Sequence, residues 1–383
     1  MKSVITTVAN RGIEIDTTRA FLRAGYSVFM KKTLLIIVLT VASGVLKSQT
    51  LDQIKTVTND FLKTLNEQQL QQVNYNFNDT SRTKWTNLPV GLAPRPGIEY
   101  GDLSAESKIQ FHHILTTLLS SQGYLKTTSI MKLDDILNEV YETAYKNKEI
   151  SDDEITELRN LKWDFSHYYF SVWGKPETTD HWGLKFEGHH ISLNLSVAGD
   201  EFSLTPLFMG TDPSEVHTTK YAGLRVLSKE EDYGFRLINA LTKEQQAVAT
   251  ISREVPKDII TNPKGEQRLT KYEGIKASSL YLEQKELLEY IIREYVNNLE
   301  HEKAHEYTDK FEKSGIDNIY FGWIGSYEPQ KPHYYVINGP DFIIEYDNMG
   351  FQMNGNHIHS IWREKGNDFG EDILRTHYLE HKH

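Results

Sequence analysis

Strict alternation between apolar and polar residues over residues 191–197 is the feature that most restricts the fold of this chain. Side chains on a β-strand point alternately to the two faces of a sheet, so the segment is typical of an antiparallel strand with one face in the core. Continuing the alternation backwards places Glu187 and His189 on the apolar side and His190 on the polar side. One imidazole is therefore expected to face the core and the other a polar surface.

Aromatic and β-branched residues mark further strand-like segments on both sides of this stretch and near the C-terminus. Apolar residues at helical spacing indicate helices at residues 51–71, 104–121, 131–146 and 281–311. Side-chain caps for helix starts are expected at Ser104, Ser151, Ser228 and Thr242. This order predicts an α+β fold in which N-terminal helices pack with a mainly antiparallel sheet and further helices lie between strand groups. No repeat or linker is apparent.

The N-terminal segment has the pattern of a secretory signal peptide: a Met followed by two lysines, a short apolar run and small residues, over residues 30–44. The apolar run is short for a membrane span. The expected boundaries are residues 1–29 for an upstream extension outside the true protein, 30–49 for the signal peptide and 50–383 for one α+β domain. That domain is expected to be helical over 51–160 and sheet-rich over 163–383, and the protein to be periplasmic or secreted.

Charge and cysteine content restrict the partners of such an exported protein. The net charge is −11, and removal of residues 1–49 takes away seven Lys/Arg and two Asp/Glu, which leaves −16. A strongly acidic chain is a poor partner for nucleic acid or for an anionic membrane, so a small-molecule substrate or ligand is expected. Because the chain has no cysteine, it has no disulfide, thiolate nucleophile or iron–sulfur cluster.

His357 and His359 are the second important pair, because residues two apart on a strand lie on the same face about 7 Å apart. Two imidazoles placed in this way can share a metal ion. The other ligands would come from His189 or His190 and from a carboxylate such as Glu187 or Glu345. Such a set of nitrogen and oxygen ligands suits Zn, Mn, Fe or Cu. The alternative is that these histidines form hydrogen bonds to backbone and carboxylates at a sheet surface.

The leading functional hypothesis is an exported metal-dependent enzyme, either hydrolytic or oxidative. In this hypothesis Glu187 or Glu345 is a ligand or general base, and Arg363 neutralises an anionic substrate or intermediate. Ser192 and Asn194 would orient His190 or the substrate.

The competing hypothesis is a non-catalytic module that binds a small molecule or a glycan through aromatic side chains. Aromatic residues make up 11% of the chain, which suits stacking against a ligand as well as an ordinary core. The aromatic residues assigned to this role are Trp182, Trp323, Tyr335 and Trp362.

A third, minor hypothesis is a zinc metallopeptidase, because His301-Glu302-Lys-Ala-His305 matches the His-Glu-x-x-His pattern on an expected helix. The helix is charged all round and no glycine-bearing extension with a third ligand follows. These features favour a solvated helix.

Several long motifs, in the same order along the chain, resemble the DUF3500 family of mostly bacterial, commonly exported proteins without an established activity. They include Trp182-Gly-Leu-Lys-Phe-Glu-Gly-His-His-Ile-Ser-Leu-Asn194, Tyr320-Phe-Gly-Trp-Ile-Gly325 and His357-Ile-His-Ser-Ile-Trp-Arg363. The resemblance implies that residues 186–194 and 357–363 are family features, whereas His301 and His305 lie outside them. It implies no reaction.

Overall fold

A computed structural model describes residues 50–177, 181–263, 269–350 and 353–380, which belong to one compact unit beginning at Thr50. The expected upstream extension and signal peptide lie outside the described residues. Within those ranges no helix combines the length and the apolar character that crossing a membrane requires.

The centre of the unit is a 13-stranded sheet whose main path runs β1-β3-β4-β5-β7-β13-β12-β11-β10-β8. Neighbours from β3 to β10 along this path are antiparallel. The main strands are β1 (Asn74–Tyr75), β3 (Tyr168–Gly174), β4 (His181–Gly188), β5 (Ile191–Ala198), β7 (Leu207–Thr211), β8 (Thr250–Ser252), β10 (Tyr320–Gly325), β11 (His333–Asn338), β12 (Phe342–Asn348) and β13 (Ile358–Glu364). Three short strands pair at the side of this path, namely β2 (Ile98–Glu99), β6 (Glu201–Ser203) and β9 (Ile275–Lys276).

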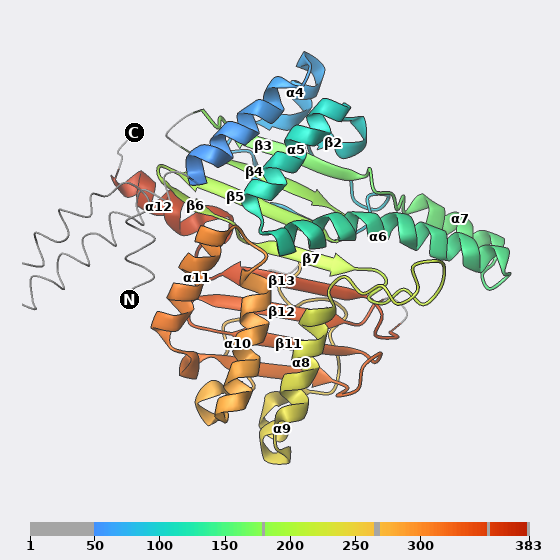
Figure 1. Ribbon diagram of the computed structural model, residues 1–383, viewed down its shortest axis with the longest axis vertical. Helices are drawn as coiled ribbons and strands as arrows, with labels where there is room; N and C mark the ends of the chain where they lie inside the picture. Colours follow the sequence, from blue (N-terminus) through green and yellow to red (C-terminus); the bar gives the residue numbers. More distant parts are fainter. Residues whose placement is uncertain (1–49, 178–180, 264–268, 351–352, 381–383) are drawn as a thin grey trace, which may run out of the picture. The chain divides into compact units, whose positions relative to one another are not determined.

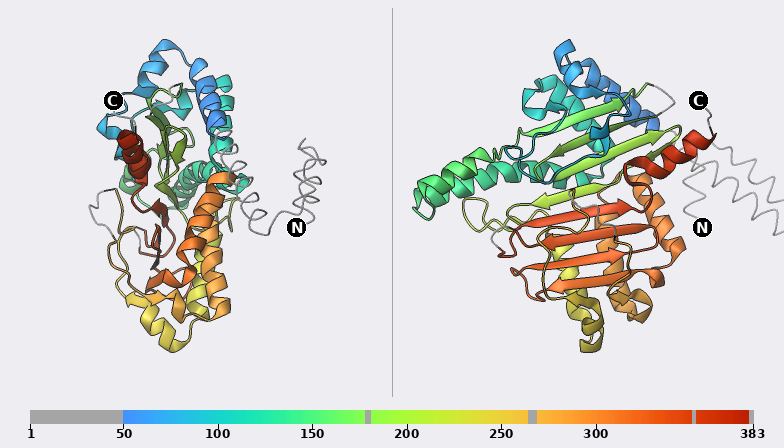
Figure 2. Two further views of the ribbon diagram at one scale, coloured as in Figure 1. Left: turned by 90° about the vertical axis from the view of Figure 1, so that its left-hand side faces the viewer. Right: turned by 180° about the vertical axis from the view of Figure 1, so that it is seen from behind.

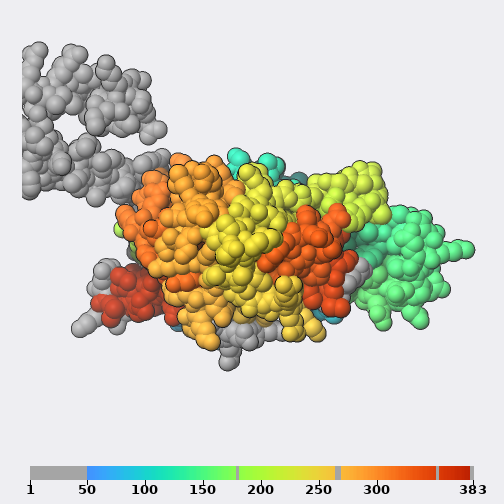
Figure 3. Space-filling model, turned by 90° about the horizontal axis from the view of Figure 1, so that it is seen from below, coloured from blue at the N-terminus to red at the C-terminus, as the bar shows by residue number. Residues whose placement is uncertain are grey.

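Long helices cover one face of the sheet, whereas loops and α12 (Glu371–Glu380) lie on the other (Figures 1 and 2). The helices are α4 (Glu67–Val73), α5 (Ala105–Leu118), α6 (Ser121–Lys146), α7 (Asp152–Asn160), α8 (Ser228–Ala240), α9 (Lys243–Ala249), α10 (Leu282–Val296) and α11 (His301–Ser314), and residues 50–63 are also helical. The predicted α+β class is confirmed. The α6–α7 pair projects beyond the edge of the sheet (Figures 1 and 3).

Three of the four side-chain caps predicted from the sequence are present in the structure. Ser104, Ser151 and Thr242 accept the expected backbone hydrogen bonds. The cap predicted at Ser228 is wrong, because α8 begins one residue earlier and Glu231 pairs instead with Arg225 and Asn348. The second helix begins at Ser121 rather than near residue 131, capped by Ser120.

The two ends of the sheet are built in the same way, although no repeat is apparent in the sequence. In the first half, β1 runs parallel to β3, β2 pairs antiparallel with β3, and β4, β5 and β7 follow. In the second half, β8, β9, β10, β11, β12 and β13 stand in the same relations. Because β7 and β13 pair antiparallel at the middle, the two halves are related by an approximate twofold rotation.

Contacts between the helical layers obey the same rotation. Leu119 and Leu299, each between two helices of its own half, form an isolated antiparallel bridge. The amide of Ser120 donates to the carbonyl of Asn298 at 3.1 Å, and the amide of Glu300 donates to the carbonyl of Leu118 at 2.9 Å. At Gly123 a Cβ would lie 1.9 Å from the Asn298 carbonyl oxygen, so only glycine permits this approach.

A buried ion cluster also joins the two halves. Lys126 of α6 lies 2.7 Å from Glu230 of α8 and 2.7 Å from Glu294 of α10. Burial opposes its charge, but the two carboxylates raise the pKa of Lys126 above its ordinary value. Lys229 also lies 3.7 Å from Glu294, so loss of Lys126 would leave the buried carboxylate of Glu230 without a cation and that of Glu294 with a more distant one.

We predict that Lys126→Met lowers the free energy of unfolding by about 3–5 kcal/mol, measured by urea denaturation, because it leaves Glu230 buried and unpaired. Glu294 would keep only its pair with the half-exposed Lys229, at 3.7 Å. The matched control is Lys132→Met on the same helix, whose half-exposed ion pair with Asp135 contributes less than about 1 kcal/mol. Equal effects of the two substitutions would show that the cluster does not join the halves.

Candidate metal centre

His189 and His190 form the two-residue turn of a β-hairpin and do not lie within one continuous strand. β4 and β5 pair directly, with Gly188 opposite Ile191, and His190 has a φ of 63°. Cross-strand partners share a face, so Glu187, opposite Ser192, lies on the polar side of β5. The prediction that Glu187 lies on the apolar side is wrong. The chain reverses direction at the two-residue turn, so the alternation of faces does not continue from β5 back into β4.

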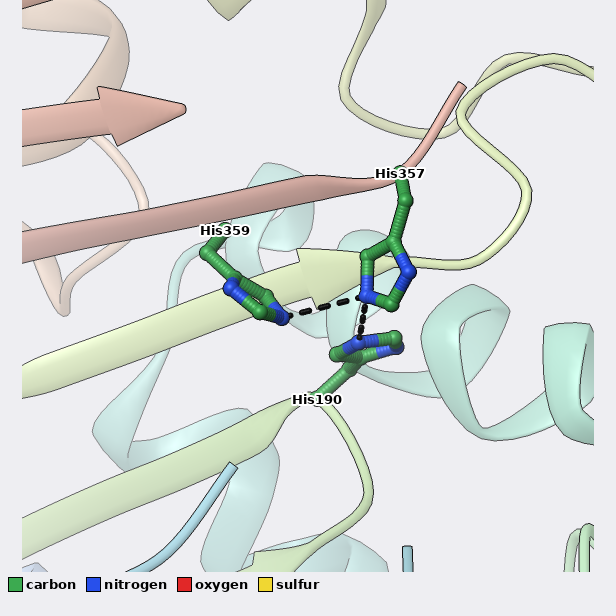
Figure 4. A group of neighbouring side chains, drawn as sticks. All are labelled: His190, His357 and His359. Carbon is green, nitrogen blue, oxygen red and sulfur yellow. Dashed lines mark hydrogen bonds between the residues drawn. The ribbon is translucent and has the colours of Figure 1, made fainter. Parts of the chain in front are cut away.

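Three imidazoles, from His190, His357 and His359, converge by their Nε2 atoms (Figure 4). The Nε2 of His357 lies 2.8 Å from that of His190 and 3.1 Å from that of His359. The ring of His357 stands nearly perpendicular to both neighbours, at 85° and 82°. The hairpin of the first half therefore meets His359 of β13 and His357, the residue just before β13, at one point.

Carboxylates hold the other ring nitrogen of two of these histidines. The Nδ1 of His357 lies 3.3 Å from Asp212, and the Nδ1 of His359 lies 2.9 Å from Asp258 and 3.6 Å from Asp347. A carboxylate beside Nδ1 keeps the hydrogen on that nitrogen and leaves the lone pair on Nε2. When both rings are neutral, the Nε2 lone pairs of His357 and His359 therefore face each other, 3.1 Å apart.

This arrangement fits a bound cation better than a set of hydrogen bonds. Each ring nitrogen offers one in-plane position, so the Nε2 of His357 cannot make two linear hydrogen bonds at once. Three imidazoles bound to one tetrahedral ion have nitrogens about 3.3 Å apart, for metal–nitrogen distances near 2.0–2.1 Å. The two measured spacings are slightly shorter, so a small outward movement of the rings would admit an ion.

Burial and mutual repulsion limit the positive charge that the three imidazoles can carry together. Burial, followed by the neighbouring imidazoles, lowers the pKa of His190 and of His357 well below the ordinary value. Burial acts in the same direction on His359, but Asp347 and Asp258 overcome it and raise its pKa to about 10. A proton on the Nε2 of His359 and a metal ion would therefore compete for the same place.

Small residues make room for the rings. A Cβ on Gly210, which pairs with His359 across β7 and β13, would lie 2.8 Å from the His190 ring. A Cβ on Gly350, which has a φ of 68°, would lie 2.7 Å from the Cβ of His357. Both glycines are required by close approach to a histidine of the cluster, and Gly350 also by its backbone conformation.

His189 lies beside the cluster and supports it. Its Nδ1 lies 2.7 Å from Asp134 of α6, and its ring stacks on that of His190 with centroids 3.7 Å apart. The hydroxyl of Tyr168 donates to Asp134 and to the carbonyl of His189. These contacts fix the hairpin turn to the helical layer. The Nδ1 of His189 bonds to Asp134 of α6 and not to an imidazole of the cluster.

Glu345 and Arg363 both bind one loop instead of the histidines. The carboxylate of Glu345 accepts hydrogen bonds from the amides of Ile260 and Thr261 and from the hydroxyls of Thr261 and Tyr334. The Arg363 guanidinium donates to the hydroxyl and carbonyl of Thr261 and pairs with Asp368. The same loop carries Asp258, so these two residues position the carboxylate that holds His359.

The remaining candidates lie apart from the cluster. Glu187 is buried beside Lys185, at 3.9 Å, and the amide of Asn194 donates to the Ser192 hydroxyl and to the carbonyl of Pro206. The aromatic residues assigned to an open groove are at most 2% exposed and lie in the core, namely Trp182, Trp323, Tyr335 and Trp362.

The His-Glu-x-x-His motif begins α11 at the surface. His305 is 72% exposed and lies 3.7 Å from Asp309, and Glu302 accepts a hydrogen bond from Thr50. Among the described residues, none of the possible metal-binding groups includes His301 or His305.

Asp212 and Asp258 were missed as site residues in the sequence. Asp212 directly follows the apolar strand β7, and a carboxylate at the end of a strand-like run is a usable signal. Asp258 lies about 100 residues from His359 in a loop without a pattern, so only the folded chain reveals its role.

We predict that the purified protein contains about one equivalent of a transition metal and that His357→Ala loses it, because two imidazoles bind far more weakly than three. Elemental analysis measures the content. His305→Ala, which removes an exposed imidazole, should retain the metal. The reverse outcome would move the site to α11.

We also predict that Asp258→Asn weakens metal binding about 10–100-fold, because His359 loses the carboxylate that fixes its tautomer. Competition with a chromogenic chelator measures the affinity. Asp317→Asn, at a surface ion pair with Lys285, is the control and should bind as the wild type does. Unchanged affinity in both variants would remove Asp258 from the site.

Comparison with known proteins gives the family and no reaction. No curated protein and no solved structure matches the chain significantly. The sequence profile of DUF3500, described as a protein of unknown function, matches residues 47–371. Most of the chain is covered, and the chain therefore belongs to the DUF3500 family.

Proposed function

We propose that the protein is a metal-dependent hydrolase whose ion is held by His190, His357 and His359. The observation that carries this proposal is the convergence of three Nε2 atoms, with carboxylates at the Nδ1 atoms of His357 and His359. Three histidines with carboxylates behind them leave a fourth position on a tetrahedral ion, which is the pattern of catalytic rather than structural zinc sites.

An ion in this position would supply Lewis-acid chemistry and activate water near neutral pH. The residues of the chain would contribute the rest. Asp212 and Asp258 hold the tautomers of His357 and His359, and His189 and Gly210 fix the place of the His190 ring. Glu345 and Arg363 would not contact the ion. They would position Asp258 by binding the loop that carries it.

Hydrolysis is favoured over oxidation by the donor set. Among the described residues two groups of possible ligands share His359: the three imidazoles, and His359 with Asp258 and Asp347. Both carboxylates lie at Nδ1 of His359, so the point where the three Nε2 atoms converge offers imidazoles, whereas many non-haem iron oxygenases combine two histidines with a carboxylate ligand. The binding-module alternative loses its proposed contacts, because the four aromatic residues are buried.

Export remains part of this proposal. It is supported by the basic start, apolar run and small residues of 30–44. N-terminal sequencing of the protein from the extracytoplasmic fraction tests it, and a mature start near residue 50 is expected.

We predict ester hydrolysis that disappears on treatment with a chelator, returns on addition of Zn²⁺, and falls to the uncatalysed rate in His357→Ala. Spectrophotometric assays of carboxylic and phosphate esters measure it. The rate should rise with pH through about 7, the range in which zinc-bound water ionises. Stoichiometric metal with oxygen consumption but no hydrolysis would overturn the hydrolytic assignment.

A further inference from the structure

A second candidate site lies on the loop-covered face of the sheet. A cavity of about 740 Å³ is lined by residues from three segments, among them Arg82, Lys84, Trp85, Arg363, Glu371 and Leu374. Arg363 and His359 share a face of β13 four residues apart, about 13 Å along the strand. The side chains of Trp85, Phe208, Ile259 and Ile361 form an apolar cluster on that same face, so the cavity is separate from the metal centre.

The cavity lining carries three cations, Arg82, Lys84 and Arg363, and two carboxylates, Asp368 and Glu371, which is a positive balance in a chain whose net charge is −11. Among the described residues, no carboxylate oxygen lies within 4 Å of the charged nitrogens of Arg82 or Lys84. Arg82 donates instead to the Ser196 hydroxyl and to the Phe369 carbonyl, and burial lowers its pKa. Arg363 is neutralised by Asp368. Arg82 and Lys84 therefore supply cationic charge that an anionic ligand can balance.

The segment that carries these cations is held in place. The short helix η1 (Thr80–Thr83) is capped by Asp79, which accepts a hydrogen bond from the amide of Ser81. From beneath, the buried ammonium of Lys185 donates to the carbonyls of Ser81 and Lys84. A fixed backbone reduces the ordering cost of binding, so the arrangement favours a specific small ligand.

We propose that this cavity binds a sugar acid, with the carboxylate at Arg82 and Lys84. Thr83 and Glu371 offer partners for hydroxyl groups, and Trp85 and Leu374 provide an apolar wall for a ring. Small-ligand sites combine such apolar walls with a few polar groups. The proposal goes beyond the hydrolytic function and stands without it.

The test is isothermal titration of the chain from residue 50 with D-glucuronate and, as a matched neutral probe, D-glucose. We expect glucuronate to bind and glucose not to bind. Lys84→Gln should weaken glucuronate binding about tenfold or more, because a hydrogen bond to a charged group is lost. Arg82→Gln should act similarly, and Lys84→Gln, at an exposed residue, covers the case in which Arg82→Gln does not fold. Lys63→Gln, at an exposed ion pair with Asp60, is the control.

The same titration in His357→Ala separates this site from the metal centre. Binding retained in His357→Ala and weakened in Lys84→Gln supports the proposal. No binding of glucuronate to the wild type, equal binding of glucose, or loss in His357→Ala with no effect of Lys84→Gln would each overturn it.

Discussion

The antiparallel pairing of β7 with β13 is the contact on which the rest of the structure depends. It joins two similarly built halves into one sheet and continues the hydrogen-bond ladder without a break. The same pairing places the β4–β5 turn of the first half beside the start of β13, so His190 meets His357 and His359. The helical layer repeats the junction through the Leu119–Leu299 bridge and the Lys126 cluster.

Rigidity at the site follows from this junction. Every imidazole of the cluster is fixed by groups on different elements: His190 by the ring of His189, His357 by Asp212, and His359 by Asp258. These supports are in turn bound to α6 and to the loop held by Glu345 and Arg363. A preorganised set of ligands of this kind loses little conformational freedom when an ion arrives.

Local patterns in the sequence were sufficient for the fold class and for part of the site. The spacing of His357 and His359 predicts their common face, and the alternation over 191–197 predicts the strand. Periodicity alone cannot detect a two-residue reversal at Gly188, where a Cβ would lie 2.4 Å from the Tyr168 ring, and so Glu187 was placed on the wrong face. Asp258 and the loop contacts of Glu345 and Arg363 depend on residues some 85–100 positions apart, which no local pattern reports.

The approximate twofold rotation relates the turn between β4 and β5 to the turn between β11 and β12. Gly339, Pro340 and Asp341, which connect β11 to β12, correspond to Gly188 at the end of β4 and to the turn residues His189 and His190. In both turns the last residue accepts an amide from the next strand or its end, Gly210 in one case and Lys365 in the other. The β11–β12 turn closes its hairpin, and its Asp341 accepts a hydrogen bond from Ser314, whereas the equivalent β4–β5 turn presents two imidazoles. A sheet with two equivalent corners can therefore place reactive side chains at one corner while the other serves the architecture alone.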